Sequence, residues 1–190
     1  MAVRPLTSDD ALAAIGRLDA SFERRGIPYW LFGGWAVDFH AGRVTREHAD
    51  IDIAIWQADV EAALEVVAAD GWTQMASPDD DGYTSFVRGS VHLDLAFLAA
   101  DANGIVYTPL RNGRGEWPPG SFASDVCDLA RVRAHVVSLS SLIADKGTPR
   151  ADAITATKDA ADLAVLGSVG QQPFAGAGRP RRRKPKRVSG

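Results

Sequence analysis

Two aspartates two positions apart open a segment whose residues alternate in character. Asp50 and Asp52 stand at the start of a run in which Ile51, Ile53 and Ile55 recur at every second position, the pattern of a strand with one buried face. The side chains of Asp50 and Asp52 should leave the same face, about 6 to 7 Å apart along the backbone. Such a pair offers the hard oxygen ligands of a Mg²⁺ site, which often combines one or two carboxylates with substrate phosphates. A solvated turn at the start of a strand is the alternative interpretation.

A third aspartate lies within another apolar segment. Asp94 stands between Leu93 and Leu95 in the expected strand 91–98, where a buried carboxylate is costly unless a metal, a partner or solvent compensates it. A polar outer face of that strand would also accommodate it. If Asp94 faces an acceptor hydroxyl, it can take the hydroxyl proton as a general base, so its roles as metal ligand and as base both stay open.

A glycine pair precedes the aspartates. Gly33 and Gly34 follow the apolar and aromatic run 28–32, an expected strand, and precede the expected helix 35–41, which Gly42 closes. Glycines let the backbone approach a triphosphate and present its N–H groups, and a helix N-terminus adds partial positive charge. Carboxylate-bound Mg²⁺ ions can bridge phosphates and stabilise the attacking and leaving oxygens. The glycine turn and the three carboxylates together predict phosphoryl transfer.

The elements that must position these residues follow from hydrophobic periodicity and turn residues. Ser8 is the expected N-cap of an amphipathic helix that Gly26 ends, and the aspartate pair opens the strand 50–56. The other expected elements are a helix at 58–69, a hairpin of 72–75 and 83–88, short strands at 105–108 and 132–137, a Gly- and Pro-rich loop at 109–125, and helices at 139–146 and 153–166.

Length and composition fit one globular domain with an appendage. The chain has 190 residues, of which 46% are apolar, enough for one buried core. We expect the domain at 1–170 and a disordered basic tail at 171–190, where Gly, Pro, Arg and Lys dominate. No apolar run resembles a signal peptide or a membrane span, so we expect a soluble, cytoplasmic protein without a membrane partner. Cys127, the single cysteine, fits a reducing compartment.

The net charge of −3 hides an asymmetry. Seven basic residues and no acidic one lie between Arg179 and Arg187, which leaves 14 basic and 24 acidic residues in the rest of the chain. The acidic body favours cationic small molecules and repels nucleic acid, whereas the tail can contact phosphates. Nucleic acid is therefore expected as a partner only through the tail.

The segment GGWAVDFHAGRVTREHADIDIAI, residues 33–55, resembles the opening motif of the aminoglycoside 2″-adenylyltransferase and lincosamide nucleotidyltransferase families. Both belong to the polymerase β-like nucleotidyltransferase superfamily. The match includes the glycine pair, the GRVTREH stretch and the aspartate pair, and VHLDLAF at 91–97 supplies the third aspartate. A second stretch, SLSSLIADKGTPRADAITATKDAADLAVL at 138–166, resembles the helical end of small nucleotidyltransferases.

The resemblance implies an α+β, polymerase β-like nucleotidyltransferase fold, with a mixed β-sheet flanked by helices and with C-terminal helices. It implies Mg²⁺, as two ions, and ATP or another NTP as co-substrate. It assigns Mg²⁺ ligands at Asp50, Asp52 and Asp94, with Asp94 also the base. The implied nucleotide-binding residues are Gly33 and Gly34 along the triphosphate, Thr45 and Arg46 beside the phosphates, and either Lys146 or Lys158 in contact with the triphosphate.

The function that follows is a Mg²⁺-dependent antibiotic-resistance nucleotidyltransferase. It would move a nucleoside monophosphate, AMP from ATP in the first instance, onto a hydroxyl of a small molecule such as an aminoglycoside or a lincosamide. Two alternatives stay open: a toxin-like nucleotidyltransferase that modifies RNA or protein, and a non-catalytic nucleotide- or nucleic-acid-binding module. The presence of all three aspartates argues against the last. The acceptor, the preferred NTP and the oligomeric state stay open.

Four further residues within the motif are expected to have structural roles or to lie at the surface. Trp35 is expected in the core, and Asp38 and Glu47 are interpreted as surface carboxylates. His48 is interpreted as a solvated loop residue, with contact to a phosphate or an aspartate as its alternative.

Overall fold

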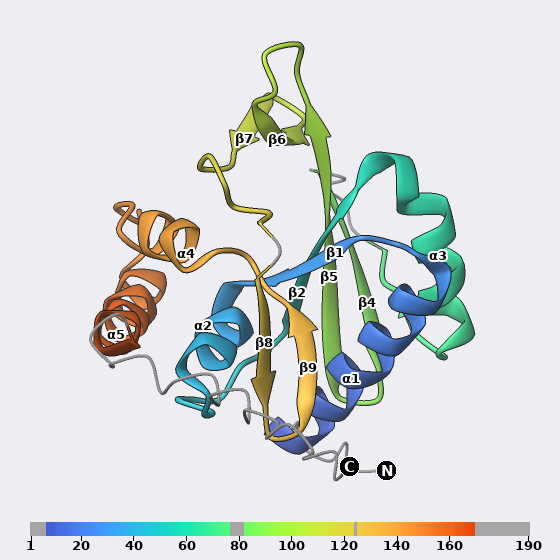
Figure 1. Ribbon diagram of the computed structural model, residues 1–190, viewed down its shortest axis with the longest axis horizontal. Coiled ribbons are helices and arrows are strands. Elements are labelled where there is room, and N and C mark those ends of the chain that lie inside the picture. The colour runs from blue at the N-terminus through green and yellow to red at the C-terminus, as the bar shows by residue number, and fades with distance from the viewer. Residues whose placement is uncertain (1–6, 77–81, 124, 170–190) are drawn as a thin grey trace, which may run out of the picture.

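The computed structural model describes residues 7–76, 82–123 and 125–169, so the basic tail predicted at 171–190 lies outside the described residues. Figure 1 shows the arrangement of the elements. They are α1 (Ser8–Arg25), β1 (Tyr29–Phe32), α2 (Gly33–Ala41), β2 (Ile51–Trp56), the 3-10 helix η1 (Gln57–Asp59), α3 (Val60–Ala69), β3 (Thr73–Gln74), β4 (Tyr83–Arg88), β5 (Val91–Ala100), β6 (Val106–Leu110), β7 (Gly113–Glu116), β8 (Val126–Leu129), β9 (Val132–His135), α4 (Leu139–Lys146) and α5 (Ala153–Val169).

A mixed sheet forms the centre of the described chain. Its strands run in the order β1-β2-β5-β4-β3, with β2 and β5 parallel and the other neighbours antiparallel. β6 extends the sheet from the end of β5 and pairs with β7, while β8 and β9 form a separate hairpin. In Figure 1, α3 lies to the right of the sheet, α1 runs diagonally across its lower part, and α2, α4 and α5 lie to its left.

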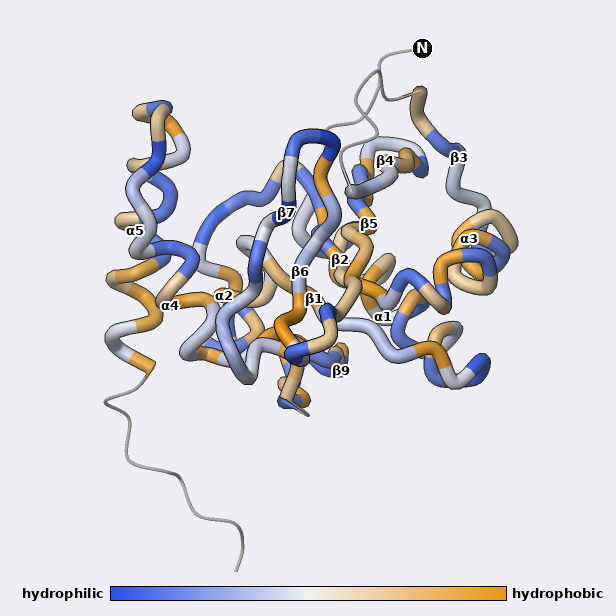
Figure 2. The backbone as a smooth tube through the Cα atoms, turned by 90° about the horizontal axis from the view of Figure 1, so that it is seen from above, coloured by the Kyte–Doolittle hydropathy of each residue, from blue (hydrophilic) through white to orange (hydrophobic). Residues whose placement is uncertain are grey.

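The central strands bury the residues that the period-two pattern singled out. Ile51, Ile53 and Ile55 are fully buried, as are Leu93 and Leu95 on the neighbouring strand. Each of these side chains stabilises the fold by about 1.5 to 3 kcal/mol relative to its exposed state. The helices complete the core with amphipathic faces: α3 combines orange, hydrophobic residues with blue, hydrophilic ones in Figure 2. None of the described helices is long and apolar enough to cross a bilayer.

The first helix begins one residue earlier than predicted. Its N-cap is Thr7, not Ser8, because Asp10 then lies at the third helical position and closes a capping box: the Thr7 hydroxyl accepts from the Asp10 N–H, and the Asp10 carboxylate accepts from the Thr7 N–H. The predicted end at Gly26 is confirmed, with a left-handed φ of 66°. Helix α2 also starts earlier than predicted, at Gly33.

The loop predicted at 109–125 is partly wrong, since strand β7 lies inside it and pairs with β6. Its sequence, GRGE, has almost no strand propensity, and cross-strand pairing overrides it. Strand β8 was missed as well. The hairpin that joins it to β9 turns through Ala130 and Arg131, both at positive φ (49° and 69°), without the Asn-Gly or Asp-Gly signal that marks such turns. The two predicted C-terminal helices are confirmed as α4 and α5.

Candidate active site

Two parallel strands bring three aspartates together. In the register of β2 and β5, Asp52 lies opposite Asp94. Asp50 immediately precedes β2, so its side chain leaves on the same side as Asp52. One carboxylate oxygen from each of Asp50, Asp52 and Asp94 lies within 4.8 Å of the other two, and all three residues are half-buried. We call these three residues the carboxylate cluster.

The electrostatics of the cluster favour a bound cation. Burial, together with the negative charges of Asp50 and Asp94, raises the pKa of Asp52 to about 8, against the opposing effect of Lys146 and Arg46. Three carboxylate oxygens at this spacing match the hard oxygen ligands that Mg²⁺ takes, and a divalent ion would relieve the repulsion among them. The donor set therefore fits Mg²⁺.

The glycine pair is required by the packing of the site itself. Gly33 has a φ of +65°, and a Cβ at that position would overlap the Asp52 carboxylate. A Cβ at Gly34 would overlap the His48 ring and come within 2.7 Å of Arg46 Nη2. The backbone at the start of α2 thus lies against the cluster and the following loop. The N-cap residue Phe32 makes no side-chain hydrogen bond to the free N–H groups there, a position that favours an anion.

Asp38 and His48 are buried, so their interpretation as a surface carboxylate and a solvated histidine is wrong. The Asp38 carboxylate is fully buried and accepts hydrogen bonds from the Thr45 amide (3.1 Å) and the Thr45 hydroxyl. Its other oxygen lies 2.6 Å from His48 Nε2. Thr45 therefore fixes the loop between α2 and β2 through Asp38. Glu47 is exposed, as expected.

The same loop places Arg46 beside His48. Arg46 Nη1 lies 2.9 Å from His48 Nδ1. A guanidinium can only donate, so Nδ1 must accept and the His48 proton must sit on Nε2, where it is donated to Asp38. Trp35, buried as predicted, packs on the His48 ring with centroids 4.7 Å apart. The loop is thereby fixed in one geometry directly before Asp50.

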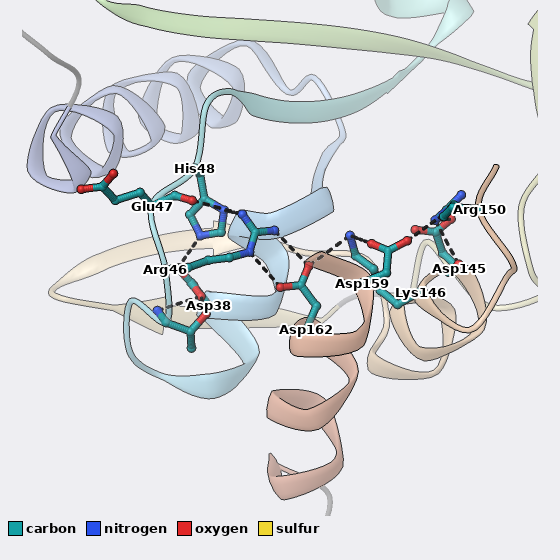
Figure 3. A network of polar contacts seen from close by, with 10 residues as sticks. Asp38, Arg46, Glu47, His48, Asp145, Lys146, Arg150, Asp159 and Asp162 are labelled. Carbon is teal, nitrogen blue, oxygen red and sulfur yellow. Dashed lines mark hydrogen bonds and ion pairs between the residues drawn. The ribbon is translucent and has the colours of Figure 1, made fainter. Parts of the chain in front are cut away.

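Ion pairs continue from Arg46 to the C-terminal helices (Figure 3). Arg46 binds both oxygens of Asp162 at 3.0 Å. Lys146 Nζ lies 2.8 Å from Asp159 and 3.2 Å from Asp162. Arg150 then binds Asp159 at 2.6 Å. We call this chain of side chains the charge network; its members are Asp38, His48, Arg46, Asp162, Lys146, Asp159, Arg150 and Asp145.

The two candidate lysines occupy different environments. The Lys146 side chain is 10% exposed, and its charge acts on Asp52. Burial alone would lower the pKa of Lys146, but hydrogen bonds and charge from Asp159 and Asp162 outweigh burial and raise it. Lys158 is exposed on α5. The geometry therefore favours Lys146 as the lysine beside the carboxylate cluster.

Asp159 and Asp162 are the site-flanking residues that sequence reasoning missed. They share one face of α5 with Leu166, at spacings of three and four residues, and all three are buried. Two aspartates on the buried stripe of a helix were the available signal, since a buried carboxylate needs a cationic partner. The identity of that partner could not be predicted, because Arg46 is 116 residues away along the chain.

A cavity of about 420 Å³ opens next to Gly33. Trp117, from the segment predicted as loop, forms one wall; its Nε1 donates to the Thr108 hydroxyl at 3.0 Å, and its ring meets Phe32 edge-on at 5.3 Å. Glu116 and Asp145 also line it, and both are paired, with Arg114 at 2.6 Å and Arg150 at 2.9 Å respectively. The cavity has a mixed apolar and polar lining and adjoins the carboxylate cluster through Gly33. Its other lining residues include Val137, Pro118 and Leu142.

Comparison with known sequences adds a family assignment. A family model described as aminoglycoside-2″-adenylyltransferase matches residues 14–143. A 2″-aminoglycoside nucleotidyltransferase of Escherichia coli is 39% identical over 56 residues, 28% of this chain and 32% of that protein. A lincosamide resistance protein of Staphylococcus haemolyticus is 56% identical over 32 residues, 17% of this chain and 20% of that protein. The aligned part thus spans about a third or less of these curated relatives.

Solved structures share the fold over most of the chain. ANT(2″)-Ia in complex with adenylyl-2″-tobramycin superposes with a TM-score of 0.64 at 25% identity, covering 84% of this chain and 88% of that one. The lincosamide antibiotic adenylyltransferase LnuA, bound to lincomycin, also gives a TM-score of 0.64, at 19% identity, covering 87% and 99%. The predicted α+β nucleotidyltransferase fold, with a mixed sheet and C-terminal helices, is confirmed.

Proposed function

The chain belongs to the aminoglycoside-2″-adenylyltransferase family, and on that premise we propose that it is a Mg²⁺-dependent nucleotidyltransferase. It transfers the nucleoside monophosphate of an NTP, ATP in the first instance, to a hydroxyl of a small antibiotic. The observation that carries the proposal is the carboxylate cluster, which lies against the glycine turn at the start of α2. A half-buried group of three neighbouring acids is costly for a protein that does not use it.

In the proposed reaction the acceptor hydroxyl oxygen bonds to the α-phosphorus of the NTP. The bond from that phosphorus to the oxygen bridging to the β-phosphate breaks, and pyrophosphate leaves. Asp94 takes the hydroxyl proton, and Asp50, Asp52 and Asp94 would together hold the Mg²⁺. When bound, Mg²⁺ supplies charge neutralisation of the phosphates and lowers the pKa of the hydroxyl.

The nucleotide and the acceptor are assigned to different sides of the cluster. Free N–H groups at the start of α2, with Arg46 and Lys146, suit the triphosphate. The aromatic residues Phe32 and Trp117 line the cavity beside Gly33, and its two carboxylates are paired with arginines, which suits a neutral, flat base better than a polycationic acceptor. The acceptor then approaches from the side of Asp94.

An aminoglycoside is the acceptor that the observations favour first. The family description and the Escherichia coli relative's name both specify the aminoglycoside 2″ position, and the acidic body of this chain attracts polyamines. A lincosamide is the second candidate, because the shorter match to the lincosamide resistance protein is also the more identical one.

Pyrophosphate release tests the proposal. The protein is incubated with Mg²⁺ and each NTP against aminoglycosides, lincosamides and tRNA, and the product is identified by mass. We expect an acceptor heavier by one nucleoside monophosphate, and no signal from Asp50→Asn. Asp59→Asn, in η1 and outside the cluster, is the matched control and should retain the activity of the wild type. Undiminished turnover by Asp50→Asn would refute the proposed mechanism.

Deletion of residues 171–190 separates the antibiotic acceptor from RNA or protein. Unchanged activity on small molecules supports the first, because the cluster and the charge network lie within the domain. Modification of RNA or protein that is lost with the tail supports the toxin-like alternative.

A further inference from the structure

Asp162 joins the two cations whose charges act on the carboxylate cluster. Its side chain is 1% exposed and projects from α5. It binds Arg46 through both oxygens at 3.0 Å, and one of these oxygens also lies 3.2 Å from Lys146 Nζ. Arg46 comes from the loop before β2 and Lys146 from the end of α4, so a single carboxylate holds cations from two elements that are distant in sequence.

Each of the two cations keeps one N–H donor beyond its contacts to described residues. Arg46 has five, and it uses two on Asp162, one on the Glu47 carbonyl and one on His48. Lys146 has three, and it directs two at Asp159 and Asp162. One N–H donor on each side chain is thus available to a bound ligand.

The remaining donor of Arg46 belongs to the nitrogen beside the start of α2. Arg46 Nη2 would lie 2.7 Å from a Cβ at Gly34, in the first turn of a helix whose initial N–H groups have no side-chain cap. Any phosphate bound there would meet backbone donors and Arg46 together. Flexible arginine and lysine side chains bind such a ligand more tightly when they are already held in place.

We infer that Asp162 is a positioning residue for the nucleotide: it holds Arg46 and Lys146 beside the carboxylate cluster so that each presents one donor to the triphosphate. The inference rests on the proposed function for the identity of the ligand. Asp162 stays ionised in this role: burial works to raise its pKa, but the hydrogen bonds from Arg46 and the charge of Lys146 prevail and lower it.

The test compares Asp162→Asn with Asp19→Asn. Asp19 is also a buried aspartate, but it lies on α1 and binds the Tyr29 hydroxyl at 2.5 Å, away from the charge network. Binding of a non-hydrolysable ATP analogue with Mg²⁺ is measured by calorimetry, and KM values are determined for the NTP and the acceptor. Asp162→Asn should weaken analogue binding and raise KM for the NTP at least tenfold, with KM for the acceptor within twofold. Asp19→Asn should leave all three within twofold.

A folded Asp162→Asn variant that binds the analogue as tightly as the wild type overturns the inference, whether or not the variant is catalytically active. If Asp162→Asn does not fold, two other variants decide. The double variant Arg46→Gln/Lys146→Gln should bind the analogue as tightly as the triple variant that also carries Asp162→Asn. The reason is that Asp162 acts only through those two cations. A tenfold difference between them overturns the inference.

The outcome for the proposed function is read separately. A wild type that shows no transferase activity with any acceptor, but binds the analogue in a manner that depends on Asp162, would refute the function and leave the positioning role standing. Turnover by the wild type together with unaltered nucleotide binding by Asp162→Asn would support the function and refute the positioning role.

Discussion

At the scale of single residues, Gly33 meets two demands at once. Its φ of +65° disfavours any residue with a Cβ, and a Cβ there would overlap the Asp52 carboxylate. Gly42, at the other end of α2, has nearly the same φ of +67° with nothing within 4 Å of the added Cβ. A Cβ at Gly42 would therefore cause backbone strain alone, whereas a Cβ at Gly33 would cause backbone strain and also crowd the carboxylate cluster.

Substitution of both glycines by alanine tests this separation. Gly42→Ala should cost about 1 kcal/mol of stability from the left-handed backbone alone and retain transferase activity. Gly33→Ala should lose that amount and, in addition, displace Asp52, so that metal affinity and activity fall at least tenfold. Thermal unfolding and Mn²⁺ titration measure the two effects. Equal activity of the two variants would show that the close approach at Gly33 is unimportant.

The raised pKa of Asp52 predicts that folding stability depends on pH, and that divalent cations reverse this dependence. Its pKa in the folded protein is raised to about 8 by burial and by its acidic neighbours, whereas the pKa of an aspartate in an unfolded chain is about 4. The folded state then binds one more proton than the unfolded state between these values, so stability without metal must fall as pH rises through that window, by at most about 1.4 kcal/mol per pH unit. A cation that requires the ionised carboxylate restores it.

The measurement is urea unfolding in EDTA from pH 5 to pH 9 for the wild type and Asp52→Asn. The difference in unfolding free energy, wild type minus variant, should decline with rising pH, and millimolar Mg²⁺ should remove the decline. A difference that is constant with pH would mean that Asp52 does not titrate in this range.

At the scale of elements, the β8–β9 hairpin shows where local sequence and tertiary structure disagree. Ala130 and Arg131 both adopt positive φ in its two-residue turn, which costs free energy for residues with a Cβ. The hairpin nevertheless forms, because β9 lies against α1 and Leu129 and Ala134 enter the core. Its packing, and not its turn sequence, specifies it.

Replacement of the turn by the preferred pair tests that account. Ala130→Asn/Arg131→Gly should stabilise the protein by about 1 kcal/mol, because Asn and Gly tolerate the left-handed region, and should leave transferase activity unchanged. Thermal unfolding checks the first expectation and pyrophosphate release the second. A lower melting temperature would contradict the strain argued for this turn.

Contacts between elements that are distant in sequence explain why the site could be predicted only in part. Alternation of apolar residues places Asp50 and Asp52 on one strand face and Asp94 in a neighbouring strand, and these patterns are local. The burial of Asp38 depends on a loop that folds back over α2, and the pairing of Asp162 with Arg46 joins residues 116 positions apart. Contacts of that kind leave no periodic signal. β7 was missed for a similar reason, since its glycines pair only because β6 is beside them.

At the scale of the whole molecule, the charge network joins α2 and the loop before β2 to the two C-terminal helices. It starts at Asp38 on α2 and His48 in the loop before β2, and it reaches Asp145 on α4 and Arg150 in the segment between α4 and α5 (Figure 3). The family match, which covers residues 14–143, includes the carboxylate cluster but stops before Asp159 and Asp162. The C-terminal helix of this chain thus contributes to the site from outside the matched segment.

The central claim is that Asp50, Asp52 and Asp94 share divalent cations with a nucleotide bound beside Gly33. Anomalous diffraction from crystals grown with Mn²⁺ and a non-hydrolysable ATP analogue measures this directly. We predict an anomalous peak within coordination distance of all three carboxylates, with the triphosphate at the start of α2. Strong Mn²⁺ peaks elsewhere, with the analogue bound and none at the cluster, would contradict the account.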